Sequence, residues 1–269
     1  MKYSLGLLTI ILLISCQEKQ KVQSADFTSS EIIQMAAPKY VVDSAFFRNS
    51  AAIDFKFRYP NAIVRYTTDG TEVTSAAKAF EKPIVVNKTS AIKAKVFHPD
   101  FTESEEVIIK VTQIKNDISN ATLTITPEYA KEYSGVGNKT LVDLKKGTFK
   151  TRSVDTWLGF NASEVVIKAK LQSEIVLSKI KLSTLTTQSG WIFSPHTVSV
   201  FSGTEQVGQH TNTAADKKEE TAMKVIEIPV KPQKYKTLKI VVHSLEKMPN
   251  WHASKGLRPW FFIDELILE

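Results

Sequence analysis

The sequence predicts an all-β protein with two sandwiches in tandem. Apolar and polar residues alternate over many short runs, and turn-forming residues separate these runs. In the second half, no run between the alternating segments has a convincing helical period, which favours antiparallel sheets over alternating strands and helices. Length is the third observation, because one domain usually has roughly 100 to 150 residues and about 250 residues follow the apolar amino-terminal segment.

The first sandwich is predicted over residues 37–114. Its alternating runs are expected to be strands at residues 53–59, 62–68, 83–87, 90–97 and 105–114. Asp69-Gly70 predicts a tight turn after the second of them, since glycine accepts the positive φ that such a turn requires. These features predict a small β-sandwich with short loops.

The turn and its surroundings resemble a known domain. YTTDGTEVTSAAKAFEKPI (66–84) and SAIKAKVFHPDFTES (90–104) resemble the carboxyl-terminal domain of chitobiases and β-hexosaminidases, which is fibronectin type III-associated. Val73 stands where that family usually has proline. The resemblance implies an immunoglobulin/fibronectin-like sandwich without known catalytic residues, so Asp69 and Glu72 are interpreted as turn residues rather than a catalytic pair.

A second sandwich is predicted over residues 129–269. Residues 115–128 are expected to be a connector, or a first strand because ATLTITP (121–127) alternates. Strands are expected at residues 164–171, 175–185, 196–202, 224–230, 235–244 and 260–269. A jelly roll suits a β-rich segment of this length.

Four segments of this second region resemble another domain. They are YSGVGNKTLVDLKKGTF (133–149), WLGF (157–160), SGWIFSPHTVSVFSG (189–203) and MPNWHASKGLRPWFFIDEL (248–266). Together they resemble the discoidin-like, coagulation-factor C-type domain appended to bacterial hexosaminidases, and this implies a jelly roll that binds carbohydrate. Two departures are Leu144, where relatives have glycine, and Lys168-Ala169-Lys170, where relatives have Asp-Leu-Gly.

The same resemblance implies one structural calcium ion. Calcium takes six to eight oxygen ligands from carboxylates and carbonyls. Asp143 and Glu265, with carbonyl groups near Leu141 and Gly147, are the expected ligands. The alternative is that Asp143 caps a turn and Glu265 pairs with a lysine.

Candidate sugar-binding residues follow from the tryptophans, because the apolar face of a pyranose stacks on an aromatic ring. All four tryptophans lie in the second region. Trp157 and Trp260 are expected in the core, since they lie within strand-like patterns. The predicted ligand-binding residues lie in loops or beside them: Trp191, Trp251, His252, Lys255 and Arg258. For the two loop tryptophans, the alternative is that the rings close the end of the barrel.

The amino-terminal segment MKYSLGLLTIILLISC predicts a membrane anchor. Lys2 precedes an apolar stretch of about ten residues that ends in Leu-Ile-Ser-Cys, and the pattern resembles a bacterial lipobox. The resemblance implies a signal peptide over residues 1–15, lipidation of Cys16, and a tether over residues 16–36. Gln17 instead of aspartate after the cysteine favours the outer membrane, and QEKQK resembles cell-surface export tags. The alternatives are a secretory signal cut elsewhere, a short transmembrane helix or a buried helix, although spanning needs about 20 apolar residues.

The remaining composition excludes several function classes. No zinc-like cysteine and histidine spacing, nucleophile elbow, Walker loop or dinucleotide fingerprint occurs. Glycosidase relatives carry their carboxylates in a barrel of some 250 residues, for which this chain has no room. The net charge of +7 comes from scattered lysines, so we expect a solvated basic surface and no nucleic acid partner.

These observations favour a noncatalytic surface lipoprotein that binds glycan and assists a glycoside hydrolase. The alternative is a structural or protein-interaction module of a cell-envelope complex. Binding of lipid headgroups is a third possibility, for which Ile192 and Phe193 are the candidate apolar residues.

Overall fold

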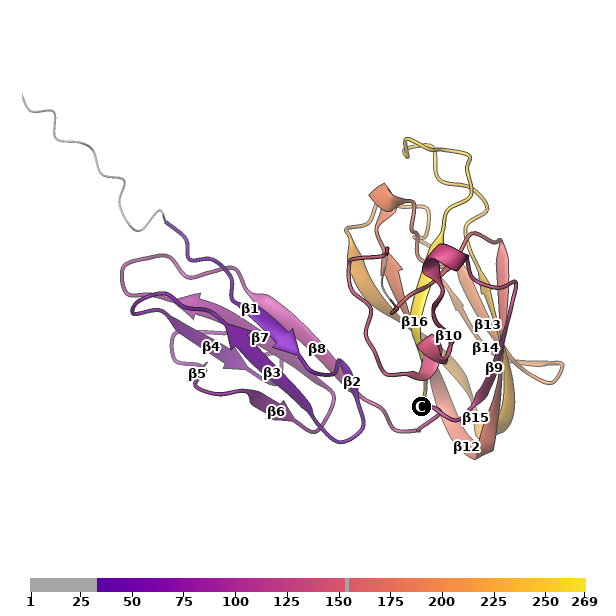
Figure 1. Cartoon of the computed structure of the whole chain (residues 1–269), viewed down its shortest axis with the longest axis horizontal. Helices are drawn as coiled ribbons and strands as arrows, with labels where there is room; N and C mark the ends of the chain where they lie inside the picture. Colours follow the sequence, from indigo (N-terminus) through magenta and orange to yellow (C-terminus); the bar gives the residue numbers. More distant parts are fainter. Residues whose placement is uncertain (1–32, 153–154) are drawn as a thin grey trace, which may run out of the picture.

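The chain folds into two β-sandwiches connected by a short segment (Figure 1). This computed structural model describes residues 33–152 and 155–269. The predicted signal peptide, Cys16 and most of the predicted tether therefore lie outside the described residues. Within the described ranges, no helix combines the length and the hydropathy needed to cross a membrane.

The first sandwich, here called the proximal sandwich, consists of a three-stranded and a five-stranded sheet. The order in the first sheet is β1 (Lys39–Val42), β3 (Ala51–Lys56), β6 (Ile84–Val86). The order in the second is β2 (Phe46–Phe47), β8 (Val107–Gln113), β7 (Ser90–Phe97), β4 (Ile63–Thr67), β5 (Lys78–Ala79). Ile53, Ile92 and Val111 are fully buried between them. The five predicted strands are present as β3, β4, β6, β7 and β8, whereas β2 and β5, with two residues each, are too short to show alternation.

The second, distal sandwich contains eight strands and three short 3₁₀ helices in the described residues. In chain order they are β9 (Thr122–Thr126), η2 (Lys131–Tyr133), β10 (Gly135–Asn138), η3 (Lys139–Val142), β11 (Leu158–Phe160), β12 (Glu164–Thr186), η4 (Gln188–Gly190), β13 (Thr197–Ser202), β14 (Glu205–Thr211), β15 (Ala222–His243) and β16 (Phe261–Leu268). The predicted all-β class is confirmed for both sandwiches. β14 (EQVGQHT) was not predicted because most of its residues are polar.

Two long bent strands build both layers of the distal sandwich. The first half of β12 pairs with β9 and the end of β15, while its second half pairs with β16 and the start of β15. A register shift between Lys170 and Ile175 separates the halves. The predicted strands 164–171 and 175–185 are therefore one strand, as are 224–230 and 235–244, because a bulge interrupts the alternation without ending the pairing.

The connection between the sandwiches is shorter than the predicted connector. Residues 122–126 pair with β12 in the distal sheet. Asp117 in the remaining segment forms a bidentate ion pair with Arg48, with both N–O distances at 2.7 Å. Asn116 donates a hydrogen bond to the Leu268 carbonyl at 3.0 Å.

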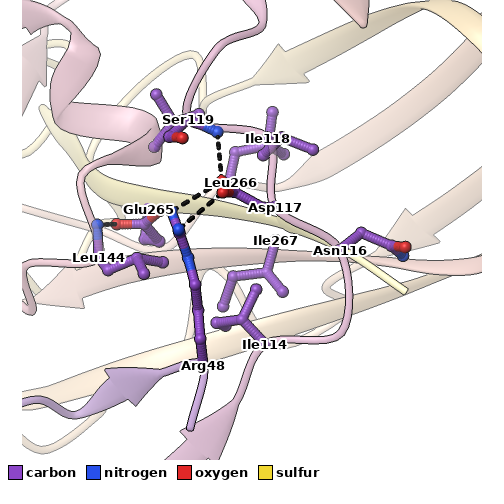
Figure 2. A pocket seen from close by; sticks show the side chains of 11 residues that line it. Arg48, Ile114, Asn116, Asp117, Ile118, Ser119, Leu144, Glu265, Leu266 and Ile267 are labelled. Atoms are coloured by element: carbon purple, nitrogen blue, oxygen red, sulfur yellow. Dashed lines mark hydrogen bonds and ion pairs between the residues drawn. The ribbon is translucent and has the colours of Figure 1, made fainter. Parts of the chain in front are cut away.

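A small apolar cluster, here called the joint, connects the two sandwiches. It contains Phe46, Ile114 and Ile267, with Leu144 packed against it. Figure 2 shows Leu144 and Ile267 of the distal sandwich facing Ile114 and Arg48 from the proximal side. Phe46 is only 2% exposed, although its neighbour Phe47 belongs to the proximal core. The two rings point in opposite directions, so Phe46 is buried by the distal sandwich.

Candidate functional site

Loops at one end of the distal sandwich surround an open space of about 780 Å³, here called the loop-end hollow. These loops lie at the end opposite the carboxyl terminus (Figure 1). Four aromatic residues line the hollow: Tyr133, Phe149, Trp260 and Phe262. Polar groups come from Thr151, Arg152, Thr187 and Ser189. An open hollow with aromatic walls and a few convergent polar groups is typical of a small-molecule site.

Tyr133, Trp260 and Phe262 form one aromatic wall. Tyr133 contacts Trp260 edge to face at 5.2 Å between ring centroids and lies 4.7 Å from Phe262. Gly159 makes this packing possible, because a Cβ at that position would lie 2.6 Å from the Tyr133 side chain. Trp260 is only partly buried, whereas the sequence predicted it in the core. It lies one residue before β16, outside the fully buried strand.

The opposite rim, residues 149–152, is held in place by Trp157. Trp157 is fully buried, as expected, and its Nε1 donates a hydrogen bond to the Thr148 carbonyl at 2.8 Å. Its ring packs against Gly147, where a Cβ would approach to 2.2 Å. Phe149 is 58% exposed just beyond this anchor. The rim therefore presents an exposed ring on a fixed base.

The loop that contains η4 forms the third side. Residues 187 and 192 exchange backbone hydrogen bonds at 3.0 and 3.1 Å, and Ile192 forms a bridge with Trp260. Ile192 lines the hollow, but Trp191 does not; its φ is 68° and its side chain is 41% exposed. Ile192 and Phe193 are 4% and 1% exposed. They are core residues and not the exposed apolar side chains that headgroup binding requires.

Trp251 and His252 lie together beside the η4 loop, and both are engaged in loop packing. Trp251 is 37% exposed, and its Nε1 donates to the Asp216 carbonyl at 2.7 Å. His252 Nδ1 accepts a hydrogen bond from the Ser254 amide at 3.0 Å, and Nε2 lies 2.9 Å from the Gln188 carbonyl. Because Nδ1 accepts, Nε2 carries the proton and donates to that carbonyl. Neither ring nitrogen of His252 is left for a ligand.

Lys255 and Arg258 are exposed on the same loop. Within the described ranges, no side-chain hydrogen bond or ion pair holds either of them. None of the five predicted ligand-binding residues lines the loop-end hollow. The structure brings Trp251 and His252 together at 5.6 Å but does not gather all five at one hollow.

The structure adds Tyr133, Phe149 and Arg152 to the candidate site. The sequence carried one signal for them, since Phe149 is a single aromatic residue in the polar run LKKGTFKTR. Tyr133 gave no such signal, because its place on the wall depends on Gly159, which is distant in sequence.

The predicted calcium ligands lie where the loop after η3 crosses β16. Glu265 is 1% exposed, and its Oε2 accepts a hydrogen bond from the Leu144 amide at 2.9 Å. Asp143 Oδ1 accepts from the Lys145 amide at 2.9 Å, as a turn-forming aspartate does. Asp264 pairs with Lys146 at 3.0 Å. The lysine therefore pairs with Asp264 and not with Glu265.

Negative charge is undercompensated in this cluster. Burial, reinforced by the charges of Asp143 and Asp264, raises the pKa of Glu265 to about 9. Burial also raises the pKa of Asp143 above its usual value. Oδ2 of Asp143 and Oδ1 of Asp264 are buried without a hydrogen-bond partner in the described structure. A hard cation would relieve both conditions, so Asp143 and Glu265 fit calcium.

The set of side chains is nevertheless small. Among the described residues, no three histidine, cysteine, aspartate or glutamate side chains are arranged to hold a metal ion. A calcium ion here would need backbone carbonyls or water for its remaining ligands, as calcium sites commonly do.

Comparison with known families matches one part of the chain. Residues 42–109 match the chitobiase/beta-hexosaminidase C-terminal domain. This domain lies within the proximal sandwich, and the match confirms the resemblance predicted from the Asp69-Gly70 turn. No curated protein matches the chain.

Solved structures with a similar fold include carbohydrate-binding modules. The family 32 module of Streptococcus pneumoniae EndoD is 12% identical, with a TM-score of 0.38 over 58% of this chain and 99% of that module. Chitosan-binding module 1 of a Paenibacillus sp. IK-5 chitosanase/glucanase is 13% identical, with a TM-score of 0.35 over 58% of this chain and 99% of its own. A SusE-like protein is 11% identical, with a TM-score of 0.39 over 84% and 95%. Likeness at this level assigns no function to the chain.

Proposed function

We propose that this protein is a noncatalytic surface lipoprotein that binds carbohydrate in the loop-end hollow of its distal sandwich. The observation that carries the proposal is the combination of aromatic wall, exposed Phe149 and polar rim around one open space. Aromatic rings remove the apolar C–H face of a sugar from water, while polar side chains and a guanidinium group form hydrogen bonds with its hydroxyls. Such a site needs no catalytic carboxylates.

Each side of the hollow contributes a different group. The half-buried Trp260 and the exposed Phe149 carry the rings on which a pyranose can stack. Arg152 and Thr151 lie on the rim next to Phe149, and Ser189 lies on the η4 loop. Trp191 and Trp251 stand outside the hollow and are not part of the proposed site.

Substitution of Phe149 tests this site with little risk to the fold, because the ring is 58% exposed. We expect Phe149→Ala to weaken glycan binding at least tenfold, because one stacking contact is lost. Trp260→Ala should weaken binding further. Screening the full chain on a glycan array and measuring the best ligand by calorimetry gives these values.

Trp191→Ala is the matched control, since it removes an exposed ring outside the hollow. Its affinity should stay within twofold of the parent. Equal losses in Trp191→Ala and Phe149→Ala would contradict the site. Absence of glycan binding with the fold intact, together with a stoichiometric partner in membrane extracts, would favour the envelope-complex alternative.

The amino-terminal lipid is proposed to hold the sandwiches at the outer membrane, beside a glycoside hydrolase that uses the captured glycan. Cys16→Ser is expected to move the protein from the membrane fraction to the soluble fraction and to abolish incorporation of labelled palmitate, because the thiol is the acylation site of a lipobox. Ser15→Ala keeps the cysteine and is the control. Unchanged labelling of Cys16→Ser would contradict the anchor and favour a signal cut elsewhere.

The calcium ion is proposed to bind Asp143 and Glu265. Bound there, it would supply positive charge that fixes the loop after η3 against β16. The same loop continues through Gly147 to the Phe149 rim, so the ion would also steady one side of the hollow.

A further inference from the structure

A second surface of the distal sandwich carries an unusual arrangement of lysines. The outer face of its five-stranded layer is formed by β9, the first half of β12, the second half of β15, β13 and β14. In Figure 1, β9, β13 and β14 lie on the side of the distal sandwich away from the proximal one. None of its lysines lines the loop-end hollow, and it contains the Lys168-Ala169-Lys170 departure.

Alternation along β12 fixes the direction of these side chains. Ile167 and Ala169 are buried in the core, so Lys168 and Lys170 project outward from the same face and are exposed. The Cα atoms from which the two side chains project lie about 7 Å apart along the strand. Lys239 of β15 stands directly opposite Lys168 in the antiparallel register.

Like charges directly opposite one another destabilise a sheet. No ion pair joins Lys168, Lys170 or Lys239 to any other residue that the structure describes. Glu164, an acidic side chain on the same strand, lies at the far end of the face near His243. The positive charge of this face is therefore uncompensated within the described structure.

Threonines and a pair of valines surround the lysines. Thr124 and Thr122 of β9 stand opposite Lys168 and Lys170, and Thr237 of β15 stands on the other side of Lys170. Phe201 of β13 is paired with Lys239, whose ammonium lies 4.3 Å from the ring centroid. Val166 and Val241 are paired beside Lys168 and Lys239 on the same face and are half-buried and buried, respectively. The face thus presents cations and hydroxyls beside a small apolar patch, and its aromatic ring is covered by the Lys239 ammonium.

We propose that this lysine face binds an anionic polysaccharide, one that carries carboxylates on successive sugar rings. Positive charge on adjacent strands matches a linear polyanion lying across them, and the threonine hydroxyls can hydrogen-bond its carboxylates and hydroxyls. An anionic membrane is the less suitable partner, because the face has no protruding apolar side chain to insert between lipids. The proposal does not depend on the loop-end hollow.

Polygalacturonate is the probe, with uncharged dextran as the neutral polymer. We expect the full chain to bind polygalacturonate at low ionic strength, to lose affinity as salt rises, and to ignore dextran. Bound polyanion should also raise the melting temperature, because it binds the folded state and offsets the repulsion between lysines on adjacent strands.

The triple variant K168E/K170E/K239E is expected to weaken polygalacturonate binding at least tenfold. Its matched control, K82E/K110E/K247E, makes the same change in net charge at exposed lysines outside the face and should stay within twofold. Phe149→Ala should bind polygalacturonate as the parent does, so failure of the hollow and failure of the face are distinguishable. Equal losses in both triple variants would overturn the proposal. So would binding to phosphatidylglycerol vesicles without binding to polygalacturonate.

Discussion

Glu265→Gln is expected to raise the free energy of unfolding by about 3 kcal/mol at pH 7 in calcium-free buffer. The pKa of the Glu265 carboxyl is raised to about 9 in the folded protein, first by burial and then by Asp143 and Asp264. Its unfolded value is 4.5. At pH 7 the folded Glu265 carboxyl is therefore protonated, whereas the unfolded one is ionised, and folding bears the cost of binding that proton. Glutamine is neutral in both states and avoids this cost, and its amide oxygen can still accept the hydrogen bond from the Leu144 amide.

The pH dependence has a definite sign. Between pH 4.5 and about 9 the folded state holds more protons at this site than the unfolded state, because the folded pKa is the higher one. The contribution of Glu265 to stability is therefore greatest below pH 4.5 and is lost progressively as the pH rises toward 9. Chemical denaturation from pH 5 to 9 should show this decline in the parent and a flatter profile in Glu265→Gln.

Calcium should stabilise the parent and leave Glu265→Gln unchanged. An ion bound by Asp143 and Glu265 stabilises the charged carboxylates and offsets the decline at high pH. Asp155→Asn is the control, since Asp155 is exposed and also carries a charge near Asp143. Its response to calcium should match the parent. Equal stabilisation of the parent and Glu265→Gln by calcium would contradict the proposed ligands.

The strands of both sandwiches could be predicted because their cores enforce strict alternation. AAIDF (51–55) and AIKAKV (91–96) bury every second residue, which is the period of a strand with one face in a core. The division of β12 and β15 into shorter strands was wrong because a bulge disturbs alternation locally, whereas pairing with neighbouring strands continues on either side. The alternation of apolar and polar residues shows on which face of the sheet a residue lies. It does not show where the pairing with a neighbouring strand ends.

The candidate site was less predictable because loops decide it. Trp191 and Ile192 are adjacent in the sequence, yet only Ile192 lines the hollow, since the left-handed backbone at Trp191 turns the indole ring outward. His252 shows the same difficulty. Its residue type suits a ligand contact, but two backbone groups engage both ring nitrogens. Neither outcome is encoded in a local pattern.

Leu144, one of the two departures from the discoidin-like pattern, contributes its side chain to the joint. Its φ of 63° lies in the left-handed region, which costs a leucine about 1 kcal/mol, whereas glycine would adopt it freely. The side chain packs on the joint cluster of Phe46, Ile114 and Ile267. Strain at Leu144 is thus offset by contact between the sandwiches. Leu144→Gly should remove the backbone strain at this position and, at the same time, remove the side-chain contact with the joint.

Phe46→Ala is expected to separate the two sandwiches. The ring is 2% exposed and packs in the joint rather than in the proximal core, and truncation of a buried phenylalanine costs about 3 to 5 kcal/mol. In the parent we expect one calorimetric transition, because the joint couples the unfolding of both sandwiches. In Phe46→Ala we expect two transitions, and a larger radius of gyration by small-angle X-ray scattering.

The control must remove an aromatic ring without touching the joint. Phe80→Ala does so, because Phe80 packs edge to face on Phe55 at 5.2 Å inside the proximal sandwich. It should lower the stability of that sandwich and leave the scattering curve unchanged. If Phe46→Ala scattered as the parent does, the bidentate Arg48–Asp117 pair and the Asn116 hydrogen bond would suffice to hold the domains together. Because that ion pair is about half exposed, its contribution is expected to be small, and Phe46 should decide the result.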